Sequence, residues 1–312
     1  MTRGTILVTA ADLAPQAVAL LDGYDVVYAG KTPAEADIVG LCGQHDPVAI
    51  IVRYSGVSRA AIEAAPSLKV ISKHGSGTDT IDKAAAQAHG VAVVAAVGVN
   101  AAAVAEQALA LLLACAKSVP RLDGRMHDGH WDKATHKSLE LQGRTVGLIG
   151  LGAIGLRFAK MAHALDVQVI GHDPYARDLP AHVRAVDLDT LWRDADAISL
   201  HCPLTDDNRG LINAATLARC KPGVIVVNTA RGGLIDEAAL LAAVRSGQVR
   251  AAGLDSFAVE PMTAGHPFQH QPGFILSPHI GGVTSDAYVN MGVTAVRNVL
   301  DVLSRKGHAQ PL

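Results

Sequence analysis

The sequence has little that would suggest a disulfide-stabilised or metal-binding protein. It contains four cysteines in 312 residues, and these are scattered along the chain at Cys42, Cys115, Cys202 and Cys220. No two of them have the close spacing that zinc sites and redox motifs use, and an isolated thiol is a common core residue. We therefore assign the cysteines no function and expect no metal site.

The sequence also lacks a large excess of charge of one sign and any long hydrophobic run. Its formal net charge is -2 at pH 7, so it has no basic excess of the kind that neutralises nucleic-acid phosphates or anionic lipid headgroups. The apolar stretch at residues 101–116 is too short for a bilayer and is interrupted by Glu106 and Gln107. We therefore expect a buried helix there, and neither a nucleic-acid nor a membrane partner.

The amino terminus has no long apolar segment followed by a small-residue cleavage site. Met1 is followed by Thr2 and Arg3, and then by a strand-like segment at residues 5–9. A secretory signal peptide has a different pattern. The sequence therefore predicts a cytoplasmic protein.

Aromatic residues are scarce, at 4% of the chain, whereas 49% of the residues are hydrophobic. This composition is common among α/β enzymes, and 312 residues exceed the size at which one hydrophobic core stops growing. Short β-branched runs alternate with Ala-rich stretches, which predicts two parallel sheets covered by helices. The predicted strands are residues 6–8, 26–28, 49–52, 70–72 and 91–94, and then 146–149, 167–170, 197–200, 224–227, 252–254 and 274–276.

Three further segments complete the expected organisation. We expect helices at about residues 99–116 and at residues 286–306, the second from its apolar residues at near-helical spacing. Between the two series of strands lies a polar stretch at residues 121–140 that contains Trp131. This stretch is either an arm or a linker.

A glycine-rich turn follows the predicted strand at residues 145–149 and opens a helix. Gly150, Gly152 and Gly155 have the spacing of the dinucleotide-binding fingerprint. The first glycine permits a tight turn, the second lets the backbone approach a pyrophosphate, and the third lets the helix pack on the strand. The positive end of the helix would stabilise the phosphates.

Asp173 stands at the carboxyl end of the next strand, where a carboxylate can accept hydrogen bonds from the adenosine ribose hydroxyls. It would repel a 2′-phosphate, so the sequence favours NAD over NADP. The alternative is a chance glycine-rich turn followed by an ordinary loop aspartate.

Three other segments are expected at strand ends of the same sheet, where the ligand crevice of a doubly wound fold lies. They are residues 228–233, 255–261 and 277–282, and we expect them to meet although they are far apart in sequence. Each contains one residue suited to the chemistry of 2-keto acids: Arg231, Glu260 and His279.

Reduction of a 2-keto acid needs a group that orients the carboxylate, a proton donor, and a group that keeps the donor charged. Arg231 offers a planar fork for a carboxylate, and His279 can donate or accept a proton near neutral pH. Glu260 would favour the protonated imidazole. Taken singly, the same residues could be a surface ion pair, a helix-start acid and a loop histidine.

With these motifs, nearly the whole chain resembles the D-isomer-specific 2-hydroxyacid dehydrogenase family, and within it most closely the D-3-phosphoglycerate dehydrogenases. The matching segments are residues 75–82, 150–155, 201–205, 228–233, 255–261 and 279–282. The resemblance implies that Arg231, Glu260 and His279 are catalytic. It also implies an NAD site lined by Gly150, Gly152, Ala153, Ile154, Gly155, Asp173, His201, Pro203, Thr229, Ala230, Arg231, Asp255, His279, Gly281 and Gly282.

The resemblance further implies the domain organisation. A discontinuous, flavodoxin-like substrate domain would comprise residues 1–99 and 286–312, and an NAD-binding domain would comprise residues 100–285. Family members are usually homodimers, and residues 121–140 correspond to their dimerisation arm. Because the sequence ends at Leu312, the carboxyl-terminal regulatory domains of long phosphoglycerate dehydrogenases are expected to be absent.

The substrate is a small 2-hydroxy or 2-keto acid by this resemblance. Arg231 and His279 would bind its reacting end, and the small residues Ser76 and Gly77 would leave backbone N–H groups free for a carboxylate, unless they form a plain turn. Arg53 and Lys73 match positions where phosphoglycerate-type relatives place cations, so a substrate phosphate is one possibility and solvation of both side chains is the other.

Two of these positions depart from the family pattern, because Lys73 replaces a common arginine and His74 is not small. 3-Phosphohydroxypyruvate, hydroxypyruvate, glyoxylate and longer 2-keto acids would all satisfy Arg231 and the loop of Ser76, so all of them stay open as substrates. Formate-type relatives carry glutamine at the position of Glu260, and phosphite-type relatives carry lysine at that of Ser76, so both fit less well. A different class, the NAD-sensing corepressors that resemble these enzymes, is also an alternative.

Overall fold

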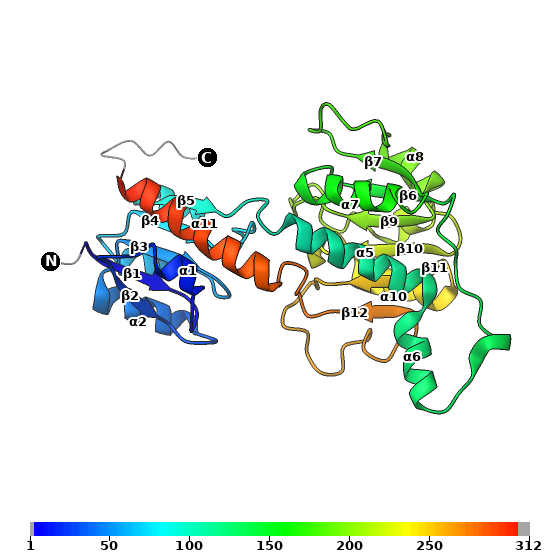
Figure 1. The fold of residues 1–312 in the computed structure, drawn as a ribbon, viewed down its shortest axis with the longest axis horizontal. Helices are drawn as coiled ribbons and strands as arrows, with labels where there is room; N and C mark the ends of the chain where they lie inside the picture. The colour runs from blue at the N-terminus through cyan, green and yellow to red at the C-terminus, as the bar shows by residue number, and fades with distance from the viewer. Residues whose placement is uncertain (1–2, 305–312) are drawn as a thin grey trace. The chain divides into compact units, whose positions relative to one another are not determined.

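The computed structural model describes residues 3–304, which divide into two compact units (Figure 1). Unit 1 comprises Met1–Asn100 and Gly282–Leu312, and unit 2 comprises Ala101–Gly281. The chain returns to unit 1 at Gly282, whereas the sequence predicted that the substrate domain resumes at residue 286. Gly282 packs against unit 1, since a Cβ there would lie 2.6 Å from Nδ2 of Asn100. Residues 305–312 of the predicted first domain and tail helix lie outside the described residues.

The sheet of unit 1 has five parallel strands in the order β2-β1-β3-β4-β5, the flavodoxin-like order that the sequence predicted. Most residues of these strands are β-branched or small and apolar, as in a sheet covered on both faces. The strands are β1 (Thr5–Val8), β2 (Asp25–Tyr28), β3 (Ala49–Val52), β4 (Val70–Lys73) and β5 (Ala92–Ala95).

Helices cover both faces of this sheet, because successive strand side chains point to opposite faces. Ile6 and Val8 pack with Val299 of α11, the orange-to-red helix of Figure 1, whereas Leu7 packs with Ile38 of α2 on the other face. The helix predicted from the apolar spacing at residues 286–306 is therefore present as α11 within the described residues. The helices are α1 (Pro15–Val18), α2 (Glu35–His45), α3 (Arg59–Glu63), α4 (Lys83–Ala88) and α11 (Ser285–Ser304).

The sheet of unit 2 has seven parallel strands in the order β12-β11-β10-β9-β6-β7-β8. The order reverses between β6 and β9, where a doubly wound sheet binds its ligand. The two-sheet α/β fold class predicted from the sequence is thereby confirmed. The strands are β6 (Thr145–Ile149), β7 (Gln168–His172), β8 (Val183–Ala185), β9 (Ala197–Leu200), β10 (Val224–Asn228), β11 (Val249–Leu254) and β12 (Phe274–Leu276).

Two apolar layers hold the helices of unit 2 to its sheet. Leu148 packs with Phe158 of α7 and Leu112 of α5, and Ile149 packs with Trp192 of α8 on the opposite face. The helices are α5 (Ala101–Lys117), α6 (Val119–His127), α7 (Ala153–His163), α8 (Leu188–Asp194), α9 (Ala214–Leu217) and α10 (Glu237–Ser246), with 3-10 turns η1 (Asp132–Ala134) and η2 (Gly232–Leu234).

The stretch between α5 and β6 is the least buried part of unit 2. Within it α6 forms a helix that the sequence did not predict, and none of its residues is buried. Val119, Met126 and Trp131 are exposed there by 56%, 52% and 74%. Among the described residues no single helix is long and apolar enough to cross a membrane, and α5 with α6 passes that test only as a pair bent by 61°.

Candidate active site

The glycine-rich turn between β6 and α7 is shaped by two close backbone contacts. Gly150 has φ of +97°, and a Cβ there would lie 2.6 Å from the backbone N of Cys202. A Cβ on Gly155 would lie 2.2 Å from the carbonyl oxygen of Gly150, so the helix packs directly on the turn. Both positions therefore exclude larger residues.

Gly152 differs from its two neighbours, because a Cβ there would meet no atom within 4 Å. It is the N-cap of α7 and provides no side-chain cap for the first turn of that helix, which begins with Ala153 and Ile154. Uncapped N–H groups next to open space at a helix N-terminus suit a phosphate. This turn therefore fits the pyrophosphate of a dinucleotide.

Asp173 directly follows β7 and is tied to the same turn. Its Oδ2 accepts a hydrogen bond of 2.8 Å from the backbone N–H of Leu151, and its Oδ1 accepts one of 2.9 Å from that of Tyr175. Each carboxylate oxygen can accept a second hydrogen bond. The carboxylate thus lies where the sequence placed it, next to the turn, and it can still receive ribose hydroxyls.

Polar atoms without partners lie on the two neighbouring strand ends. Within the described part of the chain, Oγ1 of Thr229 and both ring nitrogens of His201 are buried without a hydrogen-bond partner. Burial lowers the pKa of His201 to about 3, so this ring is neutral at physiological pH. Buried polar groups without partners are costly and mark a place where a ligand can bind. Pro203 follows on the loop of His201, and its carbonyl accepts a hydrogen bond from Asn208.

His279 and Glu260 form a direct pair. Nδ1 of His279 lies 2.7 Å from Oε2 of Glu260, and Oε1 of Glu260 accepts a 2.9 Å hydrogen bond from the backbone N–H of Phe257. The side chains are 46% and 34% exposed, so the imidazole is accessible while its partner is held from both sides.

The pair shifts the titration of both residues. The hydrogen bond that His279 donates to Glu260 raises the pKa of His279, against the opposing effect of burial. Burial alone would raise the pKa of Glu260, but hydrogen bonds from His279 and Phe257, with the nearby charges of His279 and Arg231, together hold that pKa below its usual value. The charged pair is therefore favoured, as a proton donor near neutral pH requires.

Arg231 reaches this pair through a close approach of two loops. It follows β10, where its carbonyl accepts a 2.9 Å hydrogen bond from Nδ2 of Asn228 and its Nη1 donates one of 2.8 Å to the carbonyl of Ala230. A Cβ on the next residue, Gly232, would lie 1.9 Å from the carbonyl carbon of Phe257. Only glycine lets the Arg231 loop approach the Glu260 loop this closely.

Asp255 fixes the loop that carries His279. Its buried carboxylate accepts hydrogen bonds from the hydroxyl of Ser277 at 2.6 Å and from the N–H groups of Ile280 and Gly281 at 3.0 and 2.7 Å. The sequence had suggested Asp255 and Gly281 as cofactor contacts only. Their hydrogen bond also holds the loop in which His279 has a left-handed φ of 53°, a conformation that non-glycine residues rarely adopt.

Gln107 and Ser277 support this loop, although the sequence did not indicate a role for either residue. Nε2 of Gln107, on α5, donates a 3.0 Å hydrogen bond to Oγ of Ser277, which in turn donates to Asp255. The strand-end position of Ser277 could have suggested it, whereas nothing in the sequence connects Gln107 with a loop 170 residues away.

The predicted substrate residues of unit 1 follow β3 and β4. Gly75, with φ of +127°, turns the chain after β4, and Ser76 receives a weak 3.4 Å hydrogen bond from the N–H of Gly98. Gly77 lies next to it in the same loop, half-buried. Nζ of Lys73 donates a 2.5 Å hydrogen bond to the backbone carbonyl of Arg53, so the ammonium group lies next to the end of β3.

Arg53 itself is engaged by other side chains. Its Nη1 forms a salt bridge with the carboxylate of Asp12 and donates a 2.9 Å hydrogen bond to the carbonyl of the same residue. Its Nη2 donates a 2.8 Å hydrogen bond to the hydroxyl of Tyr54. The guanidinium lies 4.7 and 4.8 Å from the ring centres of Tyr54 and Tyr288. The sequence predicted a cation here, but not its carboxylate partner.

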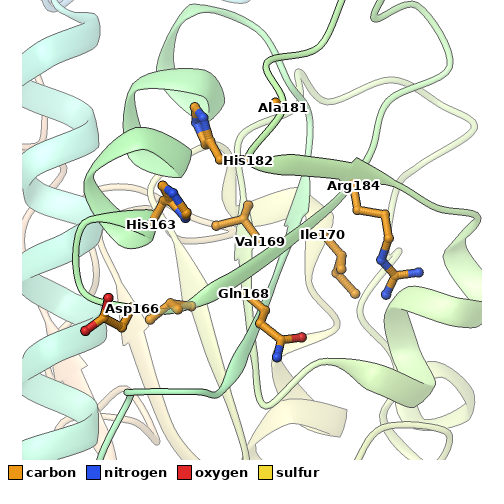
Figure 2. A pocket seen from close by; sticks show the side chains of 9 residues that line it. His163, Asp166, Gln168, Val169, Ile170, Ala181, His182 and Arg184 are labelled. Carbon is orange, nitrogen blue, oxygen red and sulfur yellow. The ribbon is translucent and has the colours of Figure 1, made fainter.

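A separate cavity of about 390 Å³ lies beside β7 and β8. Figure 2 shows its lining, in which the rings of His163 and His182 stack with their centroids 5.1 Å apart. Its wall includes Asp166 and Gln168, at the amino end of β7. Asp173 follows the opposite end of that strand, so this cavity is not part of the candidate active site.

The family follows from the nucleotide-binding unit. Residues 109–281, more than half of the chain, match the NAD binding domain of the D-isomer specific 2-hydroxyacid dehydrogenases. The chain belongs to this family. As a 2-hydroxyacid dehydrogenase it is an oxidoreductase, and the resemblance noted from its motifs is confirmed.

Curated relatives of this dehydrogenase carry two names. Hydroxypyruvate reductase of Thermotoga maritima is 42% identical over 258 residues, which cover 82% of this chain and 84% of that protein. D-3-Phosphoglycerate dehydrogenase of Mycobacterium tuberculosis is 39% identical over 298 residues, which cover 94% of this chain and 56% of that protein. The chain thus spans only about half the length of the phosphoglycerate dehydrogenases that it matches.

Solved structures of the family have the same fold. A protein from Thermus thermophilus matches with a TM-score of 0.90 and 34% identity over 96% of both chains. The NADPH-dependent glyoxylate/hydroxypyruvate reductase of Sinorhizobium meliloti, solved with NADP and malonate, matches with a TM-score of 0.87 and 28% identity over 100% of this chain and 97% of that one.

Proposed function

We propose that this dehydrogenase interconverts a small D-2-hydroxy acid and the matching 2-keto acid, with NAD as its cofactor and Arg231, Glu260 and His279 as its catalytic residues. The observation that carries the proposal is the His279–Glu260 pair, 2.7 Å from nitrogen to oxygen, within the electrostatic influence of Arg231. A charged proton donor next to a guanidinium suits a substrate with adjacent carbonyl and carboxylate groups.

Each residue has one task in the reductive direction. Arg231 binds the substrate carboxylate with its planar fork and orients the neighbouring carbonyl. His279 donates the proton on Nε2 to the carbonyl oxygen, while its Nδ1 stays hydrogen-bonded to Glu260. When bound, the nicotinamide cofactor supplies the hydride for reduction and accepts it in oxidation. In oxidation the neutral His279 accepts the hydroxyl proton, and Glu260 stabilises the resulting imidazolium.

The proposed preference for NAD rests on Asp173. Its carboxylate is held next to the glycine-rich turn by Leu151 and Tyr175, where it can accept hydrogen bonds from the two ribose hydroxyls and would repel a 2′-phosphate. The Sinorhizobium relative is named NADPH-dependent, so the fold by itself does not determine the cofactor and the proposal depends on Asp173.

Arg231 and His279 do not determine which acid is the substrate, because all 2-keto acids have the carboxylate and carbonyl groups that these residues would bind. The two names among the curated relatives correspond to hydroxypyruvate and to its phosphorylated form as candidate substrates. These two acids differ in the charge on the third carbon, so the choice between them depends on side chains outside the catalytic set.

We also propose that the protein is a cytoplasmic homodimer whose units play the roles implied by the family, with unit 1 binding substrate and unit 2 binding cofactor. The dimer is supported by the exposed apolar side chains of Met126 and Trp131, which lie on the segment that corresponds to the dimerisation arm, and of Val119 just before it. Exposed apolar groups of this size are typical of interaction surfaces.

Oxidation of NADH in the presence of a panel of 2-keto acids tests the proposed function. The panel contains hydroxypyruvate, 3-phosphohydroxypyruvate, glyoxylate and pyruvate, and it is repeated with NADPH. We expect turnover of at least one acid and a preference for NADH. Tight NADH binding without turnover of any acid would contradict the catalytic proposal and favour a nucleotide-sensing role.

A further inference from the structure

Arg53 stands at the point of unit 1 where a flavodoxin-like sheet binds its ligand. It directly follows β3, and its backbone N–H donates a 3.0 Å hydrogen bond to Oγ1 of Thr9, which directly follows β1. The strand order reverses between β1 and β3, and ligands of open α/β sheets bind at the carboxyl ends of the strands at such a reversal. The loop of Ser76 follows the adjacent strand β4. Arg53 is therefore placed to meet the substituent of a substrate.

The charge of Arg53 is nevertheless compensated. Its side chain is only 8% exposed, whereas that of its partner Asp12 is 68% exposed. The hydroxyl of Tyr288 donates a 3.0 Å hydrogen bond to Oδ1 of Asp12. This hydrogen bond, together with the nearby Arg53 and against the opposing effect of burial, lowers the pKa of Asp12. The pair thus combines a buried guanidinium with an ionised carboxylate that faces solvent.

The guanidinium has little capacity left for a second anion. Nη1 and Nη2 donate to Asp12 and to the hydroxyl of Tyr54, and the ring centres of Tyr54 and Tyr288 lie within 5 Å. Nε has no hydrogen-bond partner among the described residues, but it is buried. A phosphate that approached Arg53 would therefore first meet the carboxylate of Asp12.

His74, the next residue after β4, adds no positive charge to that of Lys73 at this edge. Burial lowers its pKa to about 4, assisted by the nearby charges of Arg53 and Lys73. Its ring lies 5.7 Å from that of Tyr288, centre to centre. The imidazole is therefore neutral at physiological pH, and it occupies space beside the tyrosine that covers Arg53.

We propose that Asp12 is a specificity-determining residue, which neutralises Arg53 and thereby selects 2-keto acids with an uncharged substituent on the third carbon against those with a phosphate there. This inference rests on the proposed function and narrows its substrate class. Like charges placed opposite each other are a direct way to suppress a wrong ligand. A neutral hydroxyl can still hydrogen-bond to the Asp12 carboxylate.

The test replaces Asp12 with its uncharged isostere and compares two substrates that differ only in the phosphate. We expect Asp12→Asn to raise the ratio of kcat/KM for 3-phosphohydroxypyruvate to that for hydroxypyruvate by roughly tenfold or more, because one like-charge contact is removed. Asp25→Asn is the matched control. It makes the same change of charge at an exposed residue at the amino end of β2, and we expect the ratio to stay at the wild-type value.

A double variant tests whether the gain for the phosphorylated acid in Asp12→Asn depends on the positive charge of Arg53. In Asp12→Asn/Arg53→Gln the gain for the phosphorylated acid should disappear. A gain that persists in the double variant, or a ratio that is the same in wild type and Asp12→Asn, would overturn the proposal.

A binding measurement separates this inference from the proposed function. Inorganic phosphate should raise the thermal midpoint of Asp12→Asn by more than it raises that of the wild type or Asp25→Asn, whether or not any acid is turned over. Equal effects of phosphate on all three proteins would contradict the role of Asp12 even if the enzyme reduces hydroxypyruvate. A phosphate effect confined to Asp12→Asn, without turnover of any acid, would retain that role and contradict the catalytic proposal.

Discussion

Nδ1 of His279 lies 2.7 Å from Oε2 of Glu260. One ring nitrogen therefore hydrogen-bonds to a carboxylate, and Nε2 is the nitrogen that we propose faces the substrate. Because the carboxylate also accepts a backbone hydrogen bond from Phe257, it cannot easily turn away from the ring. The pair therefore sets both the orientation of the histidine and the pH range in which it holds a proton.

The first prediction concerns Glu260→Gln and its effect on the pH profile. Glu260 raises the pKa of His279, so the wild-type imidazolium persists to higher pH and reduction declines only as the pH passes through that raised value. Without the carboxylate the decline should move to lower pH, and the rising limb of the oxidation reaction should move with it. Profiles of kcat/KM against pH in both directions measure this. Unchanged limbs would show that Glu260 does not control the proton of His279.

The second prediction is that His279→Ala lowers kcat by about 10²- to 10⁴-fold, the scale of general acid catalysis. NADH affinity should be nearly retained, since the proposed pyrophosphate and ribose contacts lie elsewhere in unit 2. Steady-state kinetics and NADH fluorescence titration measure the two effects. His89→Ala, which removes an exposed histidine at the end of α4, is the control. Near-normal turnover of His279→Ala would remove the residue from its proposed role.

The third prediction is that Asp173→Ser relaxes the choice of cofactor. Removal of the carboxylate eliminates the repulsion of a 2′-phosphate, so kcat/KM with NADPH should rise relative to that with NADH by about 10- to 100-fold, the worth of one or two charged contacts. Serine can still accept a hydrogen bond from the N–H of Leu151. A ratio equal to that of the wild type would mean that Asp173 does not discriminate between the two cofactors.

The fourth prediction contrasts two glycines of the same turn. A Cβ on Gly155 would lie 2.2 Å from a backbone oxygen, so Gly155→Ala should destabilise unit 2 by about 1–3 kcal/mol, seen as a lower thermal midpoint. A Cβ on Gly152 would meet nothing within 4 Å, so Gly152→Ala should keep the midpoint and instead weaken NADH binding. Equal stability of both variants, or normal NADH binding by Gly152→Ala, would contradict this view of the turn.

Features encoded by neighbouring residues could be predicted from the sequence. The turn from Gly150 to Gly155, and most of the strands, depend on short patterns of glycine or β-branched residues, and the structure has them within one or a few residues. Strand β8 was missed because Val183–Ala185 is short and only its first residue is buried. Helix α6 was missed because none of its residues is buried, which leaves no clear apolar face.

Contacts between distant residues could not be predicted. The partners Asp12 and Arg53 are separated by 41 residues, and Gln107 and Ser277 by 170. Whether a charged strand-end residue faces solvent, a ligand or a counter-ion depends on how neighbouring loops fold, and no local pattern contains that information. Arg53 could therefore be predicted as a candidate ligand contact, whereas the neutralisation of its charge by Asp12 could not.

Arg231, Glu260 and His279 all belong to unit 2, while Asp12 and Arg53 belong to unit 1. With the roles proposed above, proton transfer and substrate choice are encoded in separate stretches of the gene. Selection can alter the accepted acid by substitutions in the first hundred codons while the proton donor and its partner are inherited unchanged. A family built in this way can diversify its substrates without having to evolve its chemistry again.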